Sequence, residues 1–182
     1  LYEKYGDDTD AVTSTETMQL LDYLLQNYPF ETVKNTVGKL INTFYKSLKQ
    51  QTWEKPAESH FLSYLMLENR GVEKIIAEMR VVVKAIFSQS IGEEKKLAKQ
   101  LQHFINDLKL YELHYLKKEN ILFPFIESTF PEYRCLQLMW SFHDDFRKTL
   151  QRIEELLKRE PLRKDLLNKE LGRLFFVVLP II

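Results

Sequence analysis

The feature that most constrains the fold of this chain is an apolar repeat whose spacing alternates between four and three residues. It recurs in four stretches that are each long enough to form a helix, and on a helix it lines up as one apolar stripe. The four stripes are Phe61, Leu65, Val72, Ile75, Met79, Val82 and Ile86; Leu97, Leu101, Phe104, Leu108, Tyr111, Tyr115 and Leu122; Leu136, Met139, Phe146, Leu150, Ile153 and Leu157; and Leu167, Leu171, Leu174, Val178 and Ile181. Because each stripe needs a partner, the repeat predicts helices packed around one core.

Prolines mark the expected ends of these helices. Pro56 precedes the first, Pro124 closes the second because proline cannot continue a helix, Pro131 opens the third and Pro161 opens the fourth. The segment Ser88–Glu93, which contains Gly92, is the expected turn between the first two. No alternation typical of strands is present. Short connections between long helices favour antiparallel neighbours, so we predict an all-α, up-down-up-down four-helix bundle over residues 56–182.

Residues 1–55 precede this bundle and form a separate N-terminal unit. Leu1–Val12 is polar and acidic, and we expect a loosely held arm. Thr13 and Glu16 fit a capping box, so a helix should begin there and end before Pro29. A second helix is expected from about Phe30 to Trp53. Two helices bury too little surface alone, so we expect this hairpin to dock on the bundle or on a partner domain.

The bulk composition excludes several classes of protein. The 26 basic and 26 acidic residues cancel, which argues against a nucleic-acid-binding protein steered by positive charge. The single Cys135 allows no intrachain disulfide, and a cytoplasmic location is the simple interpretation. Leu174–Ile182 is far too short to cross a membrane, and no signal peptide is apparent. Since the chain starts at Leu1 and stops within an apolar run, we expect it to be a fragment of a longer protein.

Each of the first three stripes has one polar interruption: Glu68, Lys118 and His143. Their positions along the helices put all three roughly 9–18 Å from the same end of the bundle. An unpartnered buried charge is costly, so these side chains should meet each other, a metal or water in one largely buried layer. The interruptions can equally be salt-bridged or otherwise satisfied core residues.

Other reactive residue types have plainer interpretations. His103 lies away from the centre of its stripe and is expected on the surface. Cys135 is expected to be a partly buried, inert thiol. The sequence contains no glycine-rich phosphate loop, Ser-His-Asp triad or paired-cysteine metal motif.

The segment from His114 to Pro124, His-Tyr-Leu-Lys-Lys-Glu-Asn-Ile-Leu-Phe-Pro, resembles a signature of hemerythrin-like HHE cation-binding domains. It is most similar to the branch found beside PAS-type sensor domains, as are Leu-Glu-Asn-Arg at 67–70 and Met-Trp-Ser-Phe-His-Asp-Asp at 139–145. The resemblance spans roughly residues 57–182. It implies a non-haem iron site with one or two irons, held by histidines and carboxylates that project into a helical bundle.

Matched motif by motif, the resemblance implies five metal ligands: His60, Glu68, His114, Glu119 and His143. The chain also departs from the family pattern. The carboxylate that usually lies four residues after the histidine is replaced by Lys118, and Glu119 lies about 140° around an α-helix from His114. Ser63 stands where a second histidine is common, and the expected ligands of the fourth helix would follow Ile182.

Three functions remain open from the sequence. The first is a non-enzymatic iron-binding domain that senses oxygen, nitric oxide or redox state. It would bind a small diatomic ligand at the metal and report to a signalling domain in the same parent chain. The second is a metal-free regulatory or protein-interaction bundle in which Lys118 replaces the cation and neutralises Glu68. The third, implied by the family, is iron delivery for iron–sulfur repair, for which this chain lacks the family-wide ligand set. No nucleic-acid or membrane partner is expected.

Overall fold

The computed structural model describes residues 11–52, 54–88, 93–131 and 134–179, and every regular element within them is helical. Several sequence predictions lie outside these residues: the first ten residues of the expected arm, Trp53 as a helix end, most of the Ser88–Glu93 turn, Ile181 in the fourth stripe and the chain end at Ile182. No helix in the described part of the chain is long and apolar enough to cross a membrane.

Two helices form the N-terminal hairpin, α2 (Ser14–Asn27) and α3 (Phe30–Gln50). The predicted capping box is confirmed: the Glu16 backbone N–H donates to the Thr13 hydroxyl, and the Thr13 N–H donates to the Glu16 carboxylate at 2.8 Å. The first helix ends before Pro29, as predicted, because the residue before a proline disfavours helical geometry. Ser47 and Gln51 at the other end of α3 donate hydrogen bonds to the carbonyl oxygen of Val12, which closes the hairpin.

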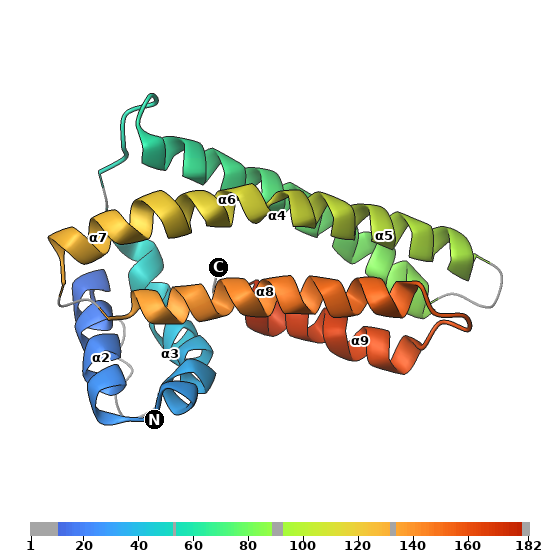
Figure 1. Ribbon diagram of the computed structural model, residues 1–182, viewed down its shortest axis with the longest axis horizontal. Helices are drawn as coiled ribbons and strands as arrows, with labels where there is room; N and C mark the ends of the chain where they lie inside the picture. Colours follow the sequence, from blue (N-terminus) through green and yellow to red (C-terminus); the bar gives the residue numbers. More distant parts are fainter. Residues whose placement is uncertain (1–10, 53, 89–92, 132–133, 180–182) are drawn as a thin grey trace.

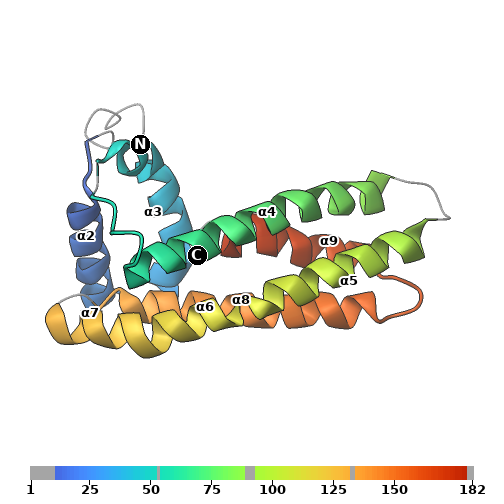
Figure 2. The same ribbon diagram turned by 90° about the horizontal axis from the view of Figure 1, so that it is seen from above.

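The rest of the chain forms a helical bundle. Its elements are α4 (Phe61–Ser88), α5 (Glu94–Leu110), α6 (Glu112–Lys117), the π-helical turn η1 (Lys118–Leu122), α7 (Phe123–Thr129), α8 (Leu136–Leu157), α9 (Lys164–Arg173) and the π-helical turn η2 (Leu174–Val178). The segments α5 through α7 continue one another as a single long rod (Figure 1). This rod packs between α4 and α8, and α9 with η2 packs on α8 (Figure 2).

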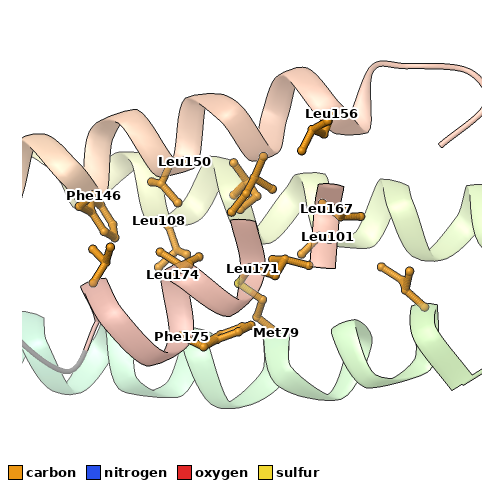
Figure 3. Packing of buried hydrophobic residues seen from close by; sticks show 14 of the residues in the cluster. Met79, Leu101, Leu108, Phe146, Leu150, Leu156, Leu167, Leu171, Leu174 and Phe175 are labelled. Atoms are coloured by element: carbon orange, nitrogen blue, oxygen red, sulfur yellow. The ribbon is translucent and has the colours of Figure 1, made fainter. Parts of the chain in front are cut away.

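The bundle core is built from the predicted stripes. Met79, Leu101, Leu108, Leu150 and Leu174 are almost fully buried, and their side chains meet between α4, α5, α8 and the C-terminal helix (Figure 3). In the fourth stripe, Leu167, Leu171, Leu174 and Val178 are all buried, as the spacing predicts. Burial of these side chains contributes about 1.5–3 kcal/mol each. The 4-3 spacing therefore identified the core-facing side of α4, α5, α8 and α9.

The N-terminal hairpin docks on the first half of α8, as expected. Leu21, Val33 and Val37 of the hairpin form a second apolar cluster with Leu138 and Phe142 of α8. In addition, the Lys34 ammonium lies 2.9 Å from the Asp145 carboxylate, with both side chains largely buried. In Figures 1 and 2 the hairpin stands across the end of the bundle where α8 begins.

The prediction that Pro124 closes the second helix is wrong. The rod continues through Pro124, which lies in the first turn of α7, to Thr129. Proline disrupts an α-helix because it lacks an N–H and its ring clashes with the carbonyl four residues earlier. Here η1 precedes it, with the Phe123 N–H bonded to the Lys118 carbonyl five residues back, so the hydrogen-bond pattern has already widened where the proline enters.

Candidate metal centre

His114 and Glu68 form the first of two histidine–carboxylate pairs. His114 comes from α6 and is 2% exposed. Its Nδ1 lies 2.9 Å from Oε2 of Glu68, which comes from α4. The other carboxylate oxygen of Glu68 accepts a hydrogen bond from the Lys117 ammonium. Glu68 is thus shared between an imidazole and a protein cation, and about a third of its side chain remains exposed.

His143 and Glu119 form the second pair. His143 on α8 is fully buried, and its Nδ1 lies 2.7 Å from Oε1 of Glu119 in η1. One turn after His143, Arg147 places Nη2 2.8 and 2.9 Å from the two Glu119 oxygens. The Arg147 Nε also donates to both oxygens of Glu112, at 2.9 Å each. This pair is therefore the more buried of the two and is closed by a guanidinium.

The π-helical turn explains why Glu119 faces the interior. An α-helix advances about 100° per residue, and on that geometry the inward positions after Tyr115 would be Lys118 and Leu122. A π-turn takes up one extra residue, so the inward positions move on by one. Glu119 and Phe123 are accordingly buried, at 5% and 2% exposure. The prediction that Lys118 occupies the inward place is therefore wrong.

Burial keeps both imidazoles neutral. Burial lowers the pKa of His114 and outweighs its hydrogen bond to Glu68. Burial, with the nearby charges of Lys118 and Arg147, lowers the pKa of His143 to about 3. Although burial alone would raise the pKa of Glu68, hydrogen bonds from Lys117 and His114 lower it overall. In each pair the Nδ1–H of the neutral imidazole donates a hydrogen bond to the carboxylate, which leaves a lone pair on Nε2.

Three buried polar atoms in this region have no hydrogen-bond partner: Nε2 of His114, Nε2 of His143 and the hydroxyl of Tyr115. The Tyr115 ring connects the two histidines, because it stacks on His143 with centroids 4.1 Å apart and meets His114 edge-on at 5.8 Å. The Tyr111 ring stacks on the His114 ring, with the two centroids 4.3 Å apart. Since buried polar groups are normally satisfied, these atoms mark a place for a water, a ligand or a cation.

Lys118 lies beside the two pairs without joining either. It is half-buried, and burial lowers the pKa of its ammonium despite the nearby Glu119. Its Nζ lies 5.9 Å from the centroid of Phe123, and it makes no ion pair with any residue that the structure describes. The prediction that Lys118 neutralises Glu68 is therefore wrong, because Lys117 does so.

The five predicted ligands are placed as follows. Glu68 and His114 meet in one pair, and Glu119 and His143 meet in the other. His60 is exposed, and its Nδ1 accepts the Leu62 N–H at 3.2 Å, an interaction within its own turn that does not bring it to either pair. Glu68, Lys118 and His143 were expected to be largely buried in one layer. Only His143 is buried, and the other two are half-buried.

Sequence reasoning missed the cations that hold the carboxylates. Arg147 follows His143 by four residues on the same helix face, and Lys117 follows His114 by three, so helical spacing could have found both. Tyr115 was assigned only to the apolar stripe. By contrast, His103 is exposed as expected, and Cys135 is buried among apolar residues, with the pKa of its thiol raised by burial.

The residues present fit a cation in donor chemistry. A ligating histidine usually donates one ring N–H to a carboxylate and presents the other nitrogen to the metal, which is the state of both His114 and His143. Within the described ranges, however, no three side chains of the His, Cys, Asp or Glu type are gathered as a ready metal cage. Because each carboxylate is already bonded to Nδ1 of its histidine, the Nε2 atoms of the two imidazoles would be the donors to a cation.

One comparison with known proteins gave a match. The family model described as the hemerythrin HHE cation-binding domain matches residues 60–176. No curated protein and no solved structure gave a significant match. The match covers α4 through α9 and includes both histidine–carboxylate pairs. The chain therefore belongs to the hemerythrin HHE cation-binding family.

Proposed function

We propose that this domain binds a single non-haem iron ion through Nε2 of His114 and Nε2 of His143. The observation that carries the proposal is that both atoms are buried and unpartnered while Nδ1 of each ring is bonded to a carboxylate. Neutral imidazole is a good ligand for iron. The family assignment supports the same chemistry.

One ion is favoured over two because both carboxylates already have protein cations. Glu68 is bonded to Lys117, and Glu119 is held by two hydrogen bonds from Arg147. A second ion would need bridging carboxylates, and each would first have to leave its partner. We therefore expect Glu68 and Glu119 to orient the imidazoles, and the antiparallel arrangement predicted for the bundle would hold the two pairs in register.

We infer a role in oxygen, nitric oxide or redox sensing rather than catalysis. A bound iron with few protein ligands supplies open positions at which a diatomic molecule can bind. Tyr115 and Phe123 stack on His143, and Tyr115 also meets His114 edge-on, so these aromatic rings would hold both imidazoles in place. The domain would act in the cytoplasm and pass its state to a signalling domain of the same parent chain. The docked N-terminal hairpin supports such a relay, because it packs on α8 beside His143.

Metal analysis of the protein reconstituted anaerobically with ferrous iron tests this function. We expect about one iron per chain, and His143→Ala and His114→Ala should each lower iron retention at least about tenfold. His103→Ala is the matched control, since His103 is an exposed histidine of the same bundle. If wild type and His143→Ala retained equal iron, or if neither retained any, the proposal would be refuted.

A metal-free regulatory bundle is the second candidate. The observation that favours it is the half-buried Lys118, an ammonium beside both pairs that has no carboxylate partner among the described residues. Its charge would repel a cation. On this hypothesis, wild type purifies without iron and Lys118→Gln gains iron affinity, because the substitution removes the charge and keeps a similar length. If iron is already bound in wild type and unchanged in Lys118→Gln, Lys118 does not replace the cation.

A further inference from the structure

A hollow of about 940 Å³ lies between α5 and the connection from α8 to α9. This connection is at the end of the bundle opposite the N-terminal hairpin (Figures 1 and 2). On α5 it extends from Lys95 to Asn106, roughly 16 Å along the helix axis. Ala98, Leu157 and Leu162 form its floor and are half-buried. The volume lies in the range that binds small organic molecules, and the floor can take an apolar group.

Basic side chains outnumber acidic ones around this hollow. Lys95, Lys99, Lys158 and Arg159 line it, against Glu154 and Glu160. Glu154 is paired with Lys109 on α5 and, at 3.3 Å, with Lys158, and Glu160 is paired with Lys95 at 3.1 Å. The pairs of Lys158 and Lys95 are weak because both lysines are mostly exposed.

Lys99 and Arg159 have no carboxylate partner within the part of the chain that the structure describes. A neighbouring hollow of about 670 Å³, on the α4 side of α5, is lined by Lys95, Lys96 and Lys99, and none of the described residues that line it is acidic. The described residues that line the two hollows therefore carry a surplus of positive charge on both sides of α5. An anion would gain charge-assisted hydrogen bonds here without displacing an existing carboxylate from Lys99 or Arg159.

We propose that the larger hollow binds an amphipathic organic anion, with its carboxylate at Lys99 and Arg159 and its apolar chain on Ala98, Leu157 and Leu162. Charge complementarity selects the anionic head, and the floor selects the apolar body. The roughly 16 Å of α5 accommodates a chain of about ten carbons. The methylene stems of Lys95 and Lys99 can cover the bound chain while their ammonium groups stay in water.

Calorimetric titration of the full chain with decanoate tests the proposal. We expect saturable binding of one decanoate, which weakens as salt is raised. The double variant K99E/R159E should weaken it at least about tenfold, since each lost charge-assisted hydrogen bond removes about that much. Hexanoate should bind more weakly by up to about fourfold for each methylene lost from the floor. Decanol, which has the chain without the charge, should bind more weakly than decanoate.

The matched control is R70E/K74E, which makes the same change of net charge at exposed positions of α4 outside the hollow. It should bind decanoate like wild type. If K99E/R159E unfolds, K99Q/R159Q gives the same comparison with a milder change, and thermal melting establishes the fold of every variant. The proposal is overturned by equal affinity in wild type and K99E/R159E, by an equal loss in R70E/K74E, or by absence of saturable decanoate binding. Binding of hexaglutamate without binding of decanoate would also overturn it, in favour of an acidic peptide.

Discussion

Replacing Arg147 with alanine should destabilise the domain strongly, because it leaves Glu119 as a buried carboxylate without its cation. Arg147 donates two hydrogen bonds to Glu119, whose side chain is 6% exposed, and two to Glu112, which is more exposed. The buried interaction is worth about 1.5–3 kcal/mol and the exposed one about 0.5–1 kcal/mol. We therefore expect a loss of about 2–4 kcal/mol.

The assay is urea or thermal unfolding of the metal-free protein at neutral pH. For a chain of this size, each kcal/mol lowers the melting temperature by about 2–4 °C, so the shift should be roughly 4–16 °C. Arg152→Ala is the control, because Arg152 also lies on α8 and reaches its carboxylate only at 3.9 Å. It should cost less than about 1 kcal/mol.

A second substitution separates the charge from the lost contacts. In Arg147→Ala, Glu119→Gln removes the unpaired carboxylate, so the double variant should be more stable than Arg147→Ala alone. The coupling between the two changes should exceed about 1 kcal/mol. A loss below about 1 kcal/mol in Arg147→Ala, or no recovery in the double variant, would show that the Arg147–Glu119 contact does not hold the site together.

Three further predictions concern acid, register and core. The pKa of His143 falls from 6.5 to about 3 on folding, so between these values the unfolded chain binds more protons, and stability present above pH 6.5 is lost as the pH falls. In urea midpoints measured from pH 7 to 5, His143→Gln should flatten this pH dependence, and an unchanged slope would contradict the argument. Deleting Lys118 removes the extra residue of η1 and places Glu119 four residues after His114, whereas inserting an alanine after Lys118 adds a second extra residue. The deletion should therefore lower the melting temperature less than the insertion, and the reverse order would refute the register argument. Leu171→Ala, at 1% exposure in the core, should cost about 2–5 kcal/mol, whereas exposed Leu113→Ala should cost less than about 1 kcal/mol by urea unfolding.

The sequence determined the helices and their inward faces, because both are local properties. The 4-3 spacing identified Leu167, Leu171 and Leu174 as core residues, and the Thr13–Glu16 capping box predicted where the first helix begins. Periodicity and capping depend on neighbours within one or two turns, so they can be read from the chain directly. The same spacing marked His143 as an inward polar residue, and it is fully buried.

Only the tertiary structure decided which polar side chains meet. The apolar spacing predicted Lys118 inward and placed Glu119 about 140° from His114, because it assumed a continuous α-helix. The π-helical turn η1 takes up one residue, and Glu119 is the buried one. The assignment of Lys117 to Glu68 and of Arg147 to Glu119 depends on the rotation of three helices against one another, which no single-helix pattern contains. Ligand-type residues were therefore readable from the sequence, but their pairing was not, because a pairing is set by the packing of distant segments and by one irregular turn.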